Sequence, residues 1–303
     1  MTESHIGDAA PRRRHYAQID VFTRRAGYGN PVAVVFDADD LDTAAMQRLA
    51  NWTNLSETTF VLAPSVAQAD FRLRIFTPRQ ELPFAGHPTL GTAHAVLDAR
   101  TDLAKRDALV LECAAGLLPL RVERTGGERR LFVQAPPARL EPPSPILLAD
   151  CEHALGAALA QAPLPRLVDV GARWLVAAAR DAREVRALRP DFARVAALTQ
   201  RHVDVVGLCV FGREDDADAA LAVRAFCPAD GIEEDPVTGS ANAAIAAFLR
   251  ASGGLAAICP RYRVSQGREI GRDGHVEVRA DAGDGPIEIG GECVTCIVGT
   301  LTF

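Results

Sequence analysis

Three titratable side chains lie beside turns that could begin helices. Glu57 starts a strand-like run, His87 lies in a Gly-His-Pro-Thr turn, and Asp235 precedes a Pro-Val-Thr-Gly-Ser turn. A carboxylate or an imidazole beside a pocket that excludes water can have its pKa pushed toward neutrality, which suits proton transfer. These residue types therefore predict general acid/base chemistry, with Glu57, His87 and Asp235 as the candidate catalytic residues.

The turns belong to a pattern that occurs twice in the chain. Its first copy spans residues 74–97 and its second copy spans residues 224–249. Each copy has the signals of a strand, a loop, a tight turn rich in Gly, Pro and Thr, and then an apolar helix. Two related halves, each presenting a polar turn at a helix start, predict one site built between them.

The first turn of each predicted helix could bind an anion. Backbone N–H groups at a helix N-terminus have no partner within the helix, and the macrodipole is positive there. Small residues at both turns let a ligand approach the backbone closely. We therefore predict a small ligand with one or more carboxylates. The candidate substrate-binding residues are Ser56, Gly86, Thr89, Thr238, Gly239 and Ser240.

Each of these signals has a plain structural alternative. Asp235 could be the N-cap of the following helix, because aspartate is a favoured N-cap residue. His87 could be an ordinary turn histidine, and Glu57 could lie at an exposed strand edge. The neighbouring Glu233 and Glu234 are expected to be solvated loop charges. Only the combination of these residues points to one site.

The remaining pattern predicts an α+β fold. Short strand-like runs surround the two apolar helices, expected at residues 88–99 and 238–251, and a helix without a polar face must be buried. Regular alternation of strands and helices is missing, as is a dinucleotide-binding glycine motif. We predict two pseudo-symmetric lobes, each with a curved, barrel-like sheet wrapped around its central helix.

The lobes can be assigned to parts of the chain. Residues 1–14, with a basic cluster, are predicted to be a disordered tail, and the five prolines between residues 135 and 145 predict a linker. Residues 15–134 with the last strand, 292–303, would form the N-terminal lobe. Residues 146–291 would form the C-terminal lobe, beginning with a helix at residues 149–159.

Composition narrows the class of function. The 303 residues, 48% hydrophobic and 24% charged, fit a globular protein of two lobes. The formal charge of −6 argues against nucleic acid or an anionic membrane as the partner. No apolar stretch reaches the ~20 residues of a membrane span, and the first 15 residues have no secretory apolar region, so we expect a cytoplasmic protein.

Cysteine usage gives no sign of a metal centre. Seven scattered cysteines fit reduced, mostly buried thiols rather than a disulfide framework. The pair Cys293 and Cys296 has a CxxC spacing but lies in a strand-like run without a second pair or an adjacent histidine. We therefore predict no metal ligands.

Four stretches occur in an order that resembles the PhzF-like family of phenazine-biosynthesis isomerases, which is related to diaminopimelate epimerase. The stretches are Asn30-Pro31-Val32-Ala33-Val34, Asn54-Leu55-Ser56-Glu57-Thr58, Phe76-Thr77-Pro78 with residues 81–89, and Glu234-Asp235-Pro236-Val237-Thr238-Gly239-Ser240-Ala241. Gln266-Gly267-Arg268 resembles the family's late Gln-Gly segment, whereas residues 271–274 depart from its usual Gly-Arg-Pro-Ser. The resemblance extends from about Tyr16 to Phe303.

The resemblance implies an active site between two lobes, a homodimer and no cofactor. It implies that Glu57 shuttles a proton between carbons of a cyclohexadiene carboxylate. It further implies that His87 and Asp235 bind and polarise the substrate, and that Ser240 belongs to the second anion loop.

Two-thiol racemisation, as in the epimerase relatives, is disfavoured. Those relatives use a cysteine at each helix start, whereas this chain has Ala85 and Pro236 near those points. We expect a cofactor-independent isomerase that moves a proton on a small carboxylate-bearing metabolite, cyclic or amino-acid-like. The alternatives are an epimerase or racemase of an amino-acid derivative and a non-catalytic metabolite-binding protein.

Overall fold

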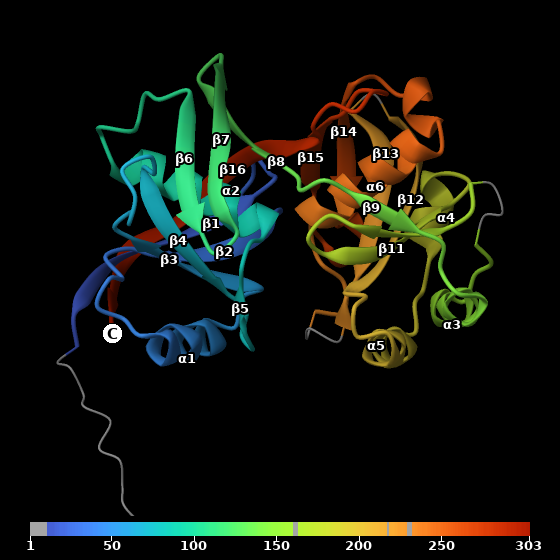
Figure 1. Cartoon of the computed structure of the whole chain (residues 1–303), viewed down its shortest axis with the longest axis horizontal. Helices are drawn as coiled ribbons and strands as arrows, with labels where there is room; N and C mark the ends of the chain where they lie inside the picture. Colours follow the sequence, from blue (N-terminus) through green and yellow to red (C-terminus); the bar gives the residue numbers. More distant parts are fainter. Residues whose placement is uncertain (1–10, 160–162, 217, 229–231) are drawn as a thin grey trace, which may run out of the picture.

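Two sheet-and-helix units lie side by side, one from each half of the chain (Figure 1). The structure is a computed structural model that describes residues 11–159, 163–216, 218–228 and 232–303. Most of the predicted disordered tail, residues 1–10, lies outside the described residues.

The tail prediction is wrong at its C-terminal end. Strand β1 begins at Arg13, and Arg14 is buried rather than solvated. Its guanidinium donates to the two carboxylate oxygens of Asp40 at 2.6 and 2.9 Å. A paired cation can be buried where a free one could not, and the sequence gives no sign of this pairing.

The first half contains most of one barrel. Its elements are β1 (Arg13–Val21), β2 (Asn30–Val35), α1 (Thr43–Thr53), β3 (Glu57–Leu62), β4 (Phe71–Phe76), β5 (Glu81–Leu82), α2 (Gly86–Ala99), β6 (Ala108–Cys113), β7 (Gly116–Thr125) and β8 (Glu128–Gln134).

The second half contains more helices than the first. Its elements are β9 (Arg139–Glu141), α3 (Pro145–Leu155), β10 (Arg166–Asp169), β11 (Arg173–Ala178), α4 (Ala182–Ala187), α5 (Phe192–Arg201), β12 (Gly207–Asp216), β13 (Ala219–Phe226), α6 (Gly239–Ala251), η2 (Gly254–Ala257), β14 (Arg261–Gln266), η3 (Arg268–Ile270), β15 (Gly274–Arg279) and β16 (Glu288–Thr302).

The first sheet closes on itself. Its strands follow the order β1-β2-β3-β4-β6-β7-β8-β16, and β16 also pairs with β1. The path then continues from β16 through β15, β14, β13, β12, β11 and β10 to β9. No pairing among the described strands joins β9 back to β16. The α+β class with a barrel sheet is therefore confirmed, but only the first unit is a closed barrel.

Strand β16 belongs to both units, which moves the predicted boundary. It begins at Glu288 rather than at residue 292, and residues 288–290 pair with both β15 and β8. Its later part, from Cys293 to Thr302, pairs with β1. The last strand therefore fastens the two units together along one continuous backbone.

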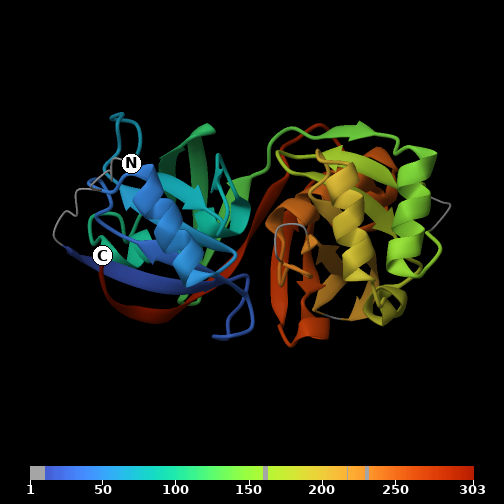
Figure 2. The ribbon, with the colours of Figure 1, turned by 90° about the horizontal axis from the view of Figure 1, so that it is seen from below.

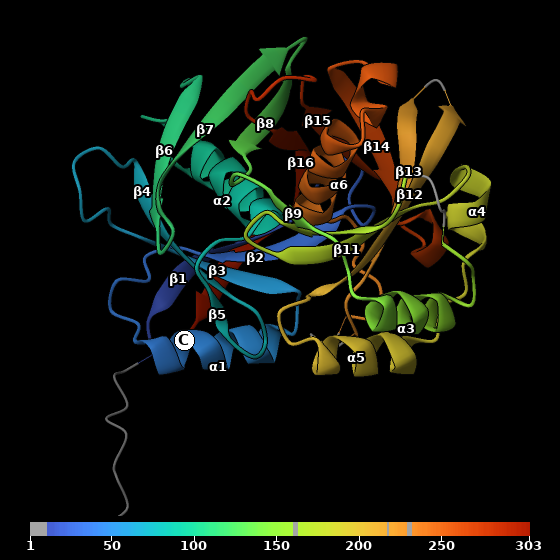
Figure 3. The same cartoon turned by 45° about the vertical axis from the view of Figure 1, so that its right-hand side comes forward.

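Helices α2 and α6 lie in the middle of the molecule, each inside its own sheet (Figure 3). In α2 every residue from His87 to Leu97 is buried, and in α6 every residue from Ala241 to Leu249 is buried. A Cβ added at Gly91 would lie 2.4 Å from a Val32 methyl carbon, so α2 rests directly on β2. The prediction of two enclosed apolar helices is confirmed.

Three further helices cover one side of the molecule, which faces the viewer in Figure 2. Helix α1 packs on β3 and β4, while α3 and α5 pack on each other and α5 contacts β12. None of the helices in the described ranges is long and apolar enough to cross a membrane.

The predicted linker and the helix after it are shifted. Residues 139–141 form β9 and pair with β10, so only the residues on either side of β9 are irregular. Helix α3 starts at Pro145 rather than at residue 149, because Ser144 caps it by accepting from the Leu147 amide at 3.2 Å. It ends before Gly156, whose φ of 62° suits a C-terminal glycine.

Candidate active site

The structure brings Glu57 and His87 together at the N-terminal end of α2. Glu57 is the first residue of β3, and His87 is the second residue of α2. Glu57 Oε2 and His87 Nε2 lie 3.1 Å apart, with only 13% and 8% of the side chains exposed. The contact is therefore a buried ion pair when the imidazole is protonated.

The ion pair keeps His87 protonated to higher pH than usual. Burial by itself lowers the pKa of His87, but the charge and hydrogen bonding of Glu57 outweigh it and raise the pKa. Asp235 and the backbone carbonyl of Pro31 act in the same direction. A proton is therefore held at the contact between the imidazole and the carboxylate, where it can be exchanged.

Asn30 connects the two halves at this point. It is completely buried, and its Nδ2 donates to Asp235 Oδ1 and to the Val237 carbonyl, both at 2.9 Å. The same nitrogen lies 3.5 Å from His87 Nδ1, and the Ser56 hydroxyl donates to Asn30 Oδ1 at 3.3 Å. One amide therefore contacts groups from both repeats.

Asp235 lies in the loop before α6 and is buried. Burial raises the pKa of its carboxyl to about 6, although His87 and hydrogen bonds from Thr238 and Asn30 oppose the shift. The N-cap alternative for Asp235 is wrong, because the N-cap of α6 is Thr238. Near neutral pH this carboxyl can therefore exist in either protonation state.

Gln266, the last residue of β14, organises the turn that follows Asp235. Its Nε2 donates to the Asp235 carbonyl at 3.0 Å and to Thr238 Oγ1 at 2.8 Å. Its Oε1 accepts from the Thr238 amide at 3.0 Å and from Asn242 Nδ2 at 3.1 Å. All the donors and acceptors of this buried side chain are thus used for the start of α6.

The two central helices differ from the peripheral ones in their N-caps. Helices α1, α3, α4 and α5 each have an Asp or Ser side chain that accepts an N–H of the first turn. Within the described chain, α2 begins after Ala85 and α6 after Thr238 without any side-chain cap. Their first N–H groups therefore remain available for a ligand, as an anion site requires.

A two-bond ion pair precedes each of these helix starts, partly exposed before α2 and buried before α6. Arg74 donates to both oxygens of Glu81 at 2.7 and 2.6 Å. Arg224 donates to both oxygens of Glu234 at 2.9 and 2.7 Å. The prediction that Glu234 is a solvated loop charge is therefore wrong. Each arginine therefore ties its strand to a glutamate that precedes a central helix.

The predicted substrate-binding residues lie near the helix starts, and they differ in whether their polar atoms already have hydrogen-bond partners. Thr89 is fully buried, and its hydroxyl has no hydrogen-bond partner among the described residues. Ser240 Oγ accepts from Trp174 Nε1 at 3.1 Å. Gly86 and Gly239 are the first residues of α2 and α6, where they offer backbone N–H groups.

Three residues that contact the site had no predicted role. Asn30 and Gln266 were noticed only as parts of longer motifs, and Trp174 had no signal at all. The available clues were an asparagine before a proline at a strand start and a glutamine before a glycine at a strand end. Neither clue says which residue the side chain contacts.

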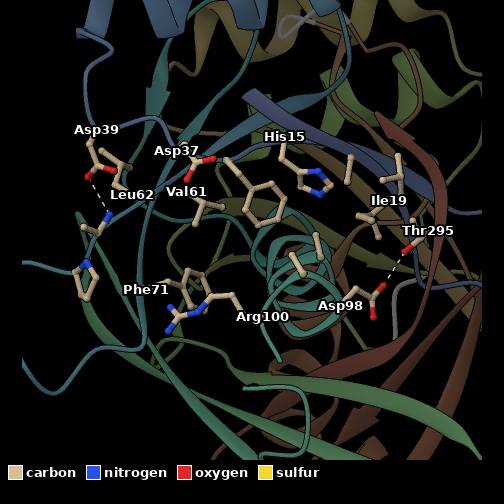
Figure 4. Close-up of a pocket in the computed structure, with 17 residues that line it drawn as sticks. His15, Ile19, Asp37, Asp39, Val61, Leu62, Phe71, Asp98, Arg100 and Thr295 are labelled. Carbon is tan, nitrogen blue, oxygen red and sulfur yellow. Dashed lines mark hydrogen bonds between the residues drawn. The ribbon is translucent and has the colours of Figure 1, made fainter. Parts of the chain in front are cut away.

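A pocket of about 720 Å³ lies at the opposite end of α2 from these residues (Figure 4). His15, Asp37, Val61, Asp98 and Arg100 are among the residues that line it, and none of the predicted site residues does. Its size alone does not make it the catalytic site, because it lacks the paired acid and base found at the N-terminal end.

Within the described residues, no group of three or more histidine, cysteine or acidic side chains is placed to hold a metal ion. None of the seven cysteines, all of which lie in the described residues, forms a disulfide bond, and only Cys151, Cys209 and Cys227 are buried. The expectation of mostly buried thiols is therefore wrong.

The sequence and the fold of this chain resemble those of known proteins over almost its whole length. Residues 19–299 match the family described as "Phenazine biosynthesis-like protein". The chain belongs to the PhzF-like family. Its fold also matches the crystal structure of the Bacillus anthracis phenazine biosynthesis protein of the PhzF family, with a TM-score of 0.82, 25% identity, and 96% of this chain and 99% of that chain covered.

Two curated relatives show the range of names within the family. The trans-2,3-dihydro-3-hydroxyanthranilate isomerase of Pseudomonas chlororaphis is 39% identical over 303 residues, covering 95% of this chain and 99% of the relative. "Antisense-enhancing sequence 1" of Schizosaccharomyces pombe is 36% identical over 291 residues, covering 94% and 97%. As a member of this family of isomerases, the protein is an isomerase.

Proposed function

We propose that this protein isomerises a small carboxylate-bearing metabolite by moving a proton between two of its carbons. The observation that supports this most directly is the buried contact of Glu57 with His87 beside Asp235. These three groups lie where two central helices begin without side-chain caps. The site therefore combines an acid/base pair with donors for an anion.

In this proposal the substrate carboxylate binds to the free N–H groups at the helix starts. Gly86 contributes from α2, and Gly239 with Ser240 contributes from α6. Such donors stabilise negative charge that spreads onto the carboxylate when a conjugated carbon loses its proton. They need no rearrangement during the reaction, because the helices already hold them in place.

Glu57 is the proposed general acid/base. Its carboxylate accepts a proton from one substrate carbon, and the resulting carboxylic acid returns a proton to another carbon, so the net reaction involves no oxidation. His87, whose raised pKa favours its cationic form, balances the charge of Glu57. Asp235, with a pKa of about 6, can donate a hydrogen bond to the substrate when protonated.

The first substrate to test is trans-2,3-dihydro-3-hydroxyanthranilate, which the curated relative from Pseudomonas chlororaphis isomerises according to its name. It carries a carboxylate on a ring, as the proposed site requires. A panel of other cyclic and amino-acid-like carboxylates should accompany it, because one fold and one family can serve several substrates.

Replacing Glu57 with glutamine tests the assignment directly. We expect Glu57→Gln to lose about a thousandfold in kcat, because the amide cannot accept the carbon proton. The rate is measured by proton NMR on the substrate that the wild-type enzyme converts. Glu233→Gln, a change in an exposed residue of the loop before Asp235, is the matched control. Full turnover by Glu57→Gln would refute the assignment.

Epimerisation of an amino-acid derivative is the second candidate. It is favoured by one observation: ionisable groups approach the site from both halves, Glu57 and His87 from the first and Asp235 from the second. Reaction in deuterated water distinguishes the two. Deuterium entering the α-carbon with inversion supports epimerisation, whereas a shifted double bond supports the proposed isomerisation.

We further propose that the protein acts in the cytoplasm as a homodimer without a cofactor. The family resemblance and the acidic composition support these expectations. Size-exclusion chromatography with light scattering would measure the oligomeric state.

A further inference from the structure

Helix α6 has an N-cap residue that does not cap. Threonine is a favoured N-cap, because its hydroxyl can accept the N–H of the third helical residue. Thr238 occupies that position in α6, with φ −113° and ψ 103°, yet no side-chain cap bond forms at this described turn. Elsewhere in the chain, Asp42, Ser144, Asp181 and Asp191 all form the expected bond.

The Thr238 hydroxyl has other partners. It accepts from Gln266 Nε2 at 2.8 Å and hydrogen-bonds to the Asp235 carboxylate. The Thr238 amide is held as well, because it donates to Gln266 Oε1 at 3.0 Å. Two bonds from one buried side chain thus hold the amide and the hydroxyl of the N-cap residue.

We propose that Gln266 is a positioning residue that keeps the N-terminus of α6 open for the substrate carboxylate. It does so by holding the Thr238 hydroxyl on the Asp235 side of the turn, away from the Ala241 amide that the hydroxyl would otherwise cap. The N–H groups of the first turn are then left for a ligand. This inference rests on the proposed function only in naming the ligand as a carboxylate.

The surrounding backbone supports this role. Gly267 follows with φ +94°, and a Cβ there would lie 2.5 Å from the Pro236 carbonyl oxygen. Strand β14 therefore ends in close contact with the loop of Asp235, which leaves Gln266 little freedom to move. The Asn242 amide, one turn into α6, holds Gln266 Oε1 from the other side at 3.1 Å.

Gln266→Met tests the proposal, because methionine has a similar length but cannot donate or accept as the amide does. We expect the ligand-free crystal structure of this variant to show Thr238 Oγ1 within hydrogen-bond distance of the Ala241 amide. Affinity for 3-hydroxyanthranilate, a stable aromatic carboxylate used as the probe, should fall about tenfold by calorimetry, since an N-cap bond must break before the anion binds.

The double variant Gln266→Met/Thr238→Val separates this mechanism from a merely structural role. Valine has no hydroxyl to cap the helix, so probe affinity should recover at least threefold relative to Gln266→Met alone. A structural defect at residue 266 predicts no recovery. An unmoved Thr238 with unchanged affinity in Gln266→Met overturns the proposal, and so does the absence of recovery in the double variant.

Gln266→Glu provides a second approach in case Gln266→Met does not fold. The carboxylate keeps an acceptor for the Thr238 amide and Asn242 but loses the donor to the Thr238 hydroxyl and adds negative charge. Probe affinity equal to wild type would overturn the proposal. If wild-type protein does not bind the probe at all, the proposed carboxylate site fails, whereas the Thr238 rotation in Gln266→Met still tests the positioning role.

Discussion

The two strand–loop–helix units, residues 74–99 and 224–251, share a motif but use it differently. In both units an arginine on a strand forms a two-bond ion pair with a glutamate that precedes the central helix. Each arginine also lies over a phenylalanine ring two residues on, at 5.1 Å for Arg74 and 5.0 Å for Arg224. In the first unit the arginine and glutamate side chains are 19% and 31% exposed. In the second unit they are 5% and 3% exposed.

The units also keep their helix starts free in different ways. The first has Ala85 as N-cap, a residue without a capping group. The second has Thr238, whose hydroxyl is engaged by Gln266. The first unit carries its ionisable group, His87, within the helix, whereas the second carries Asp235 in the loop before it. A repeated motif therefore positions unlike groups around one site.

The largest expected effect comes from the difference in burial of the ion pairs. Arg224→Met should lower the free energy of unfolding by about 3–5 kcal/mol, because Glu234 is left as an unpaired buried charge. The matched change Arg74→Met should cost about 1 kcal/mol or less, because solvent reaches that pair. Urea unfolding of both variants measures the difference. Equal losses would show that the two loops are held alike.

A smaller effect concerns the pH dependence that Asp235 gives to the second unit. Its folded pKa of about 6 lies above the usual 3.8, so the folded protein binds the proton more tightly than the unfolded chain. Stability from this group is therefore complete below about pH 4 and is lost as pH rises through about 6, by about 3 kcal/mol in total. Asp235→Asn should lack this decline.

Urea unfolding at pH 4, 6 and 8 measures the Asp235 contribution. Asp284→Asn, in an exposed loop, is the charge-matched control and should follow the wild-type curve. His87, whose pKa is also raised, adds a decline of the same sign at higher pH. A parallel pH profile for Asp235→Asn and wild type would contradict the assigned pKa shift.

The smallest expected effect comes from capping the first unit. Ala85→Ser would place a hydroxyl where it can accept an N–H of α2, and Ala85 already has the extended conformation of an N-cap. Stability should rise by about 1 kcal/mol, while carboxylate affinity should fall. Calorimetric binding and thermal unfolding measure both. Ala99→Ser, at the exposed other end of α2, is the control, and unchanged affinity in Ala85→Ser would argue against an anion site there.

Local signals predicted the elements that surround the site. The apolar runs and their Gly, Pro and Thr turns located α2 and α6 to within two residues at each start. The role of Gln266 could not be predicted, because its four hydrogen bonds go to residues 24 to 31 positions away. The burial of Glu234 was missed for a similar reason. Its ion pair with Arg224 cannot be recognised from the local sequence pattern.

The sequence by itself determined which segments become buried helices and which turns could bind an anion, because periodicity and turn chemistry act over a few residues. The tertiary structure alone decided that Asn30 and Asp235, 205 positions apart, share a hydrogen bond, and that Glu57 meets His87. Those contacts depend on the register of β2 with β3 and on strand β16 fastening the two units together, which no short stretch of sequence encodes.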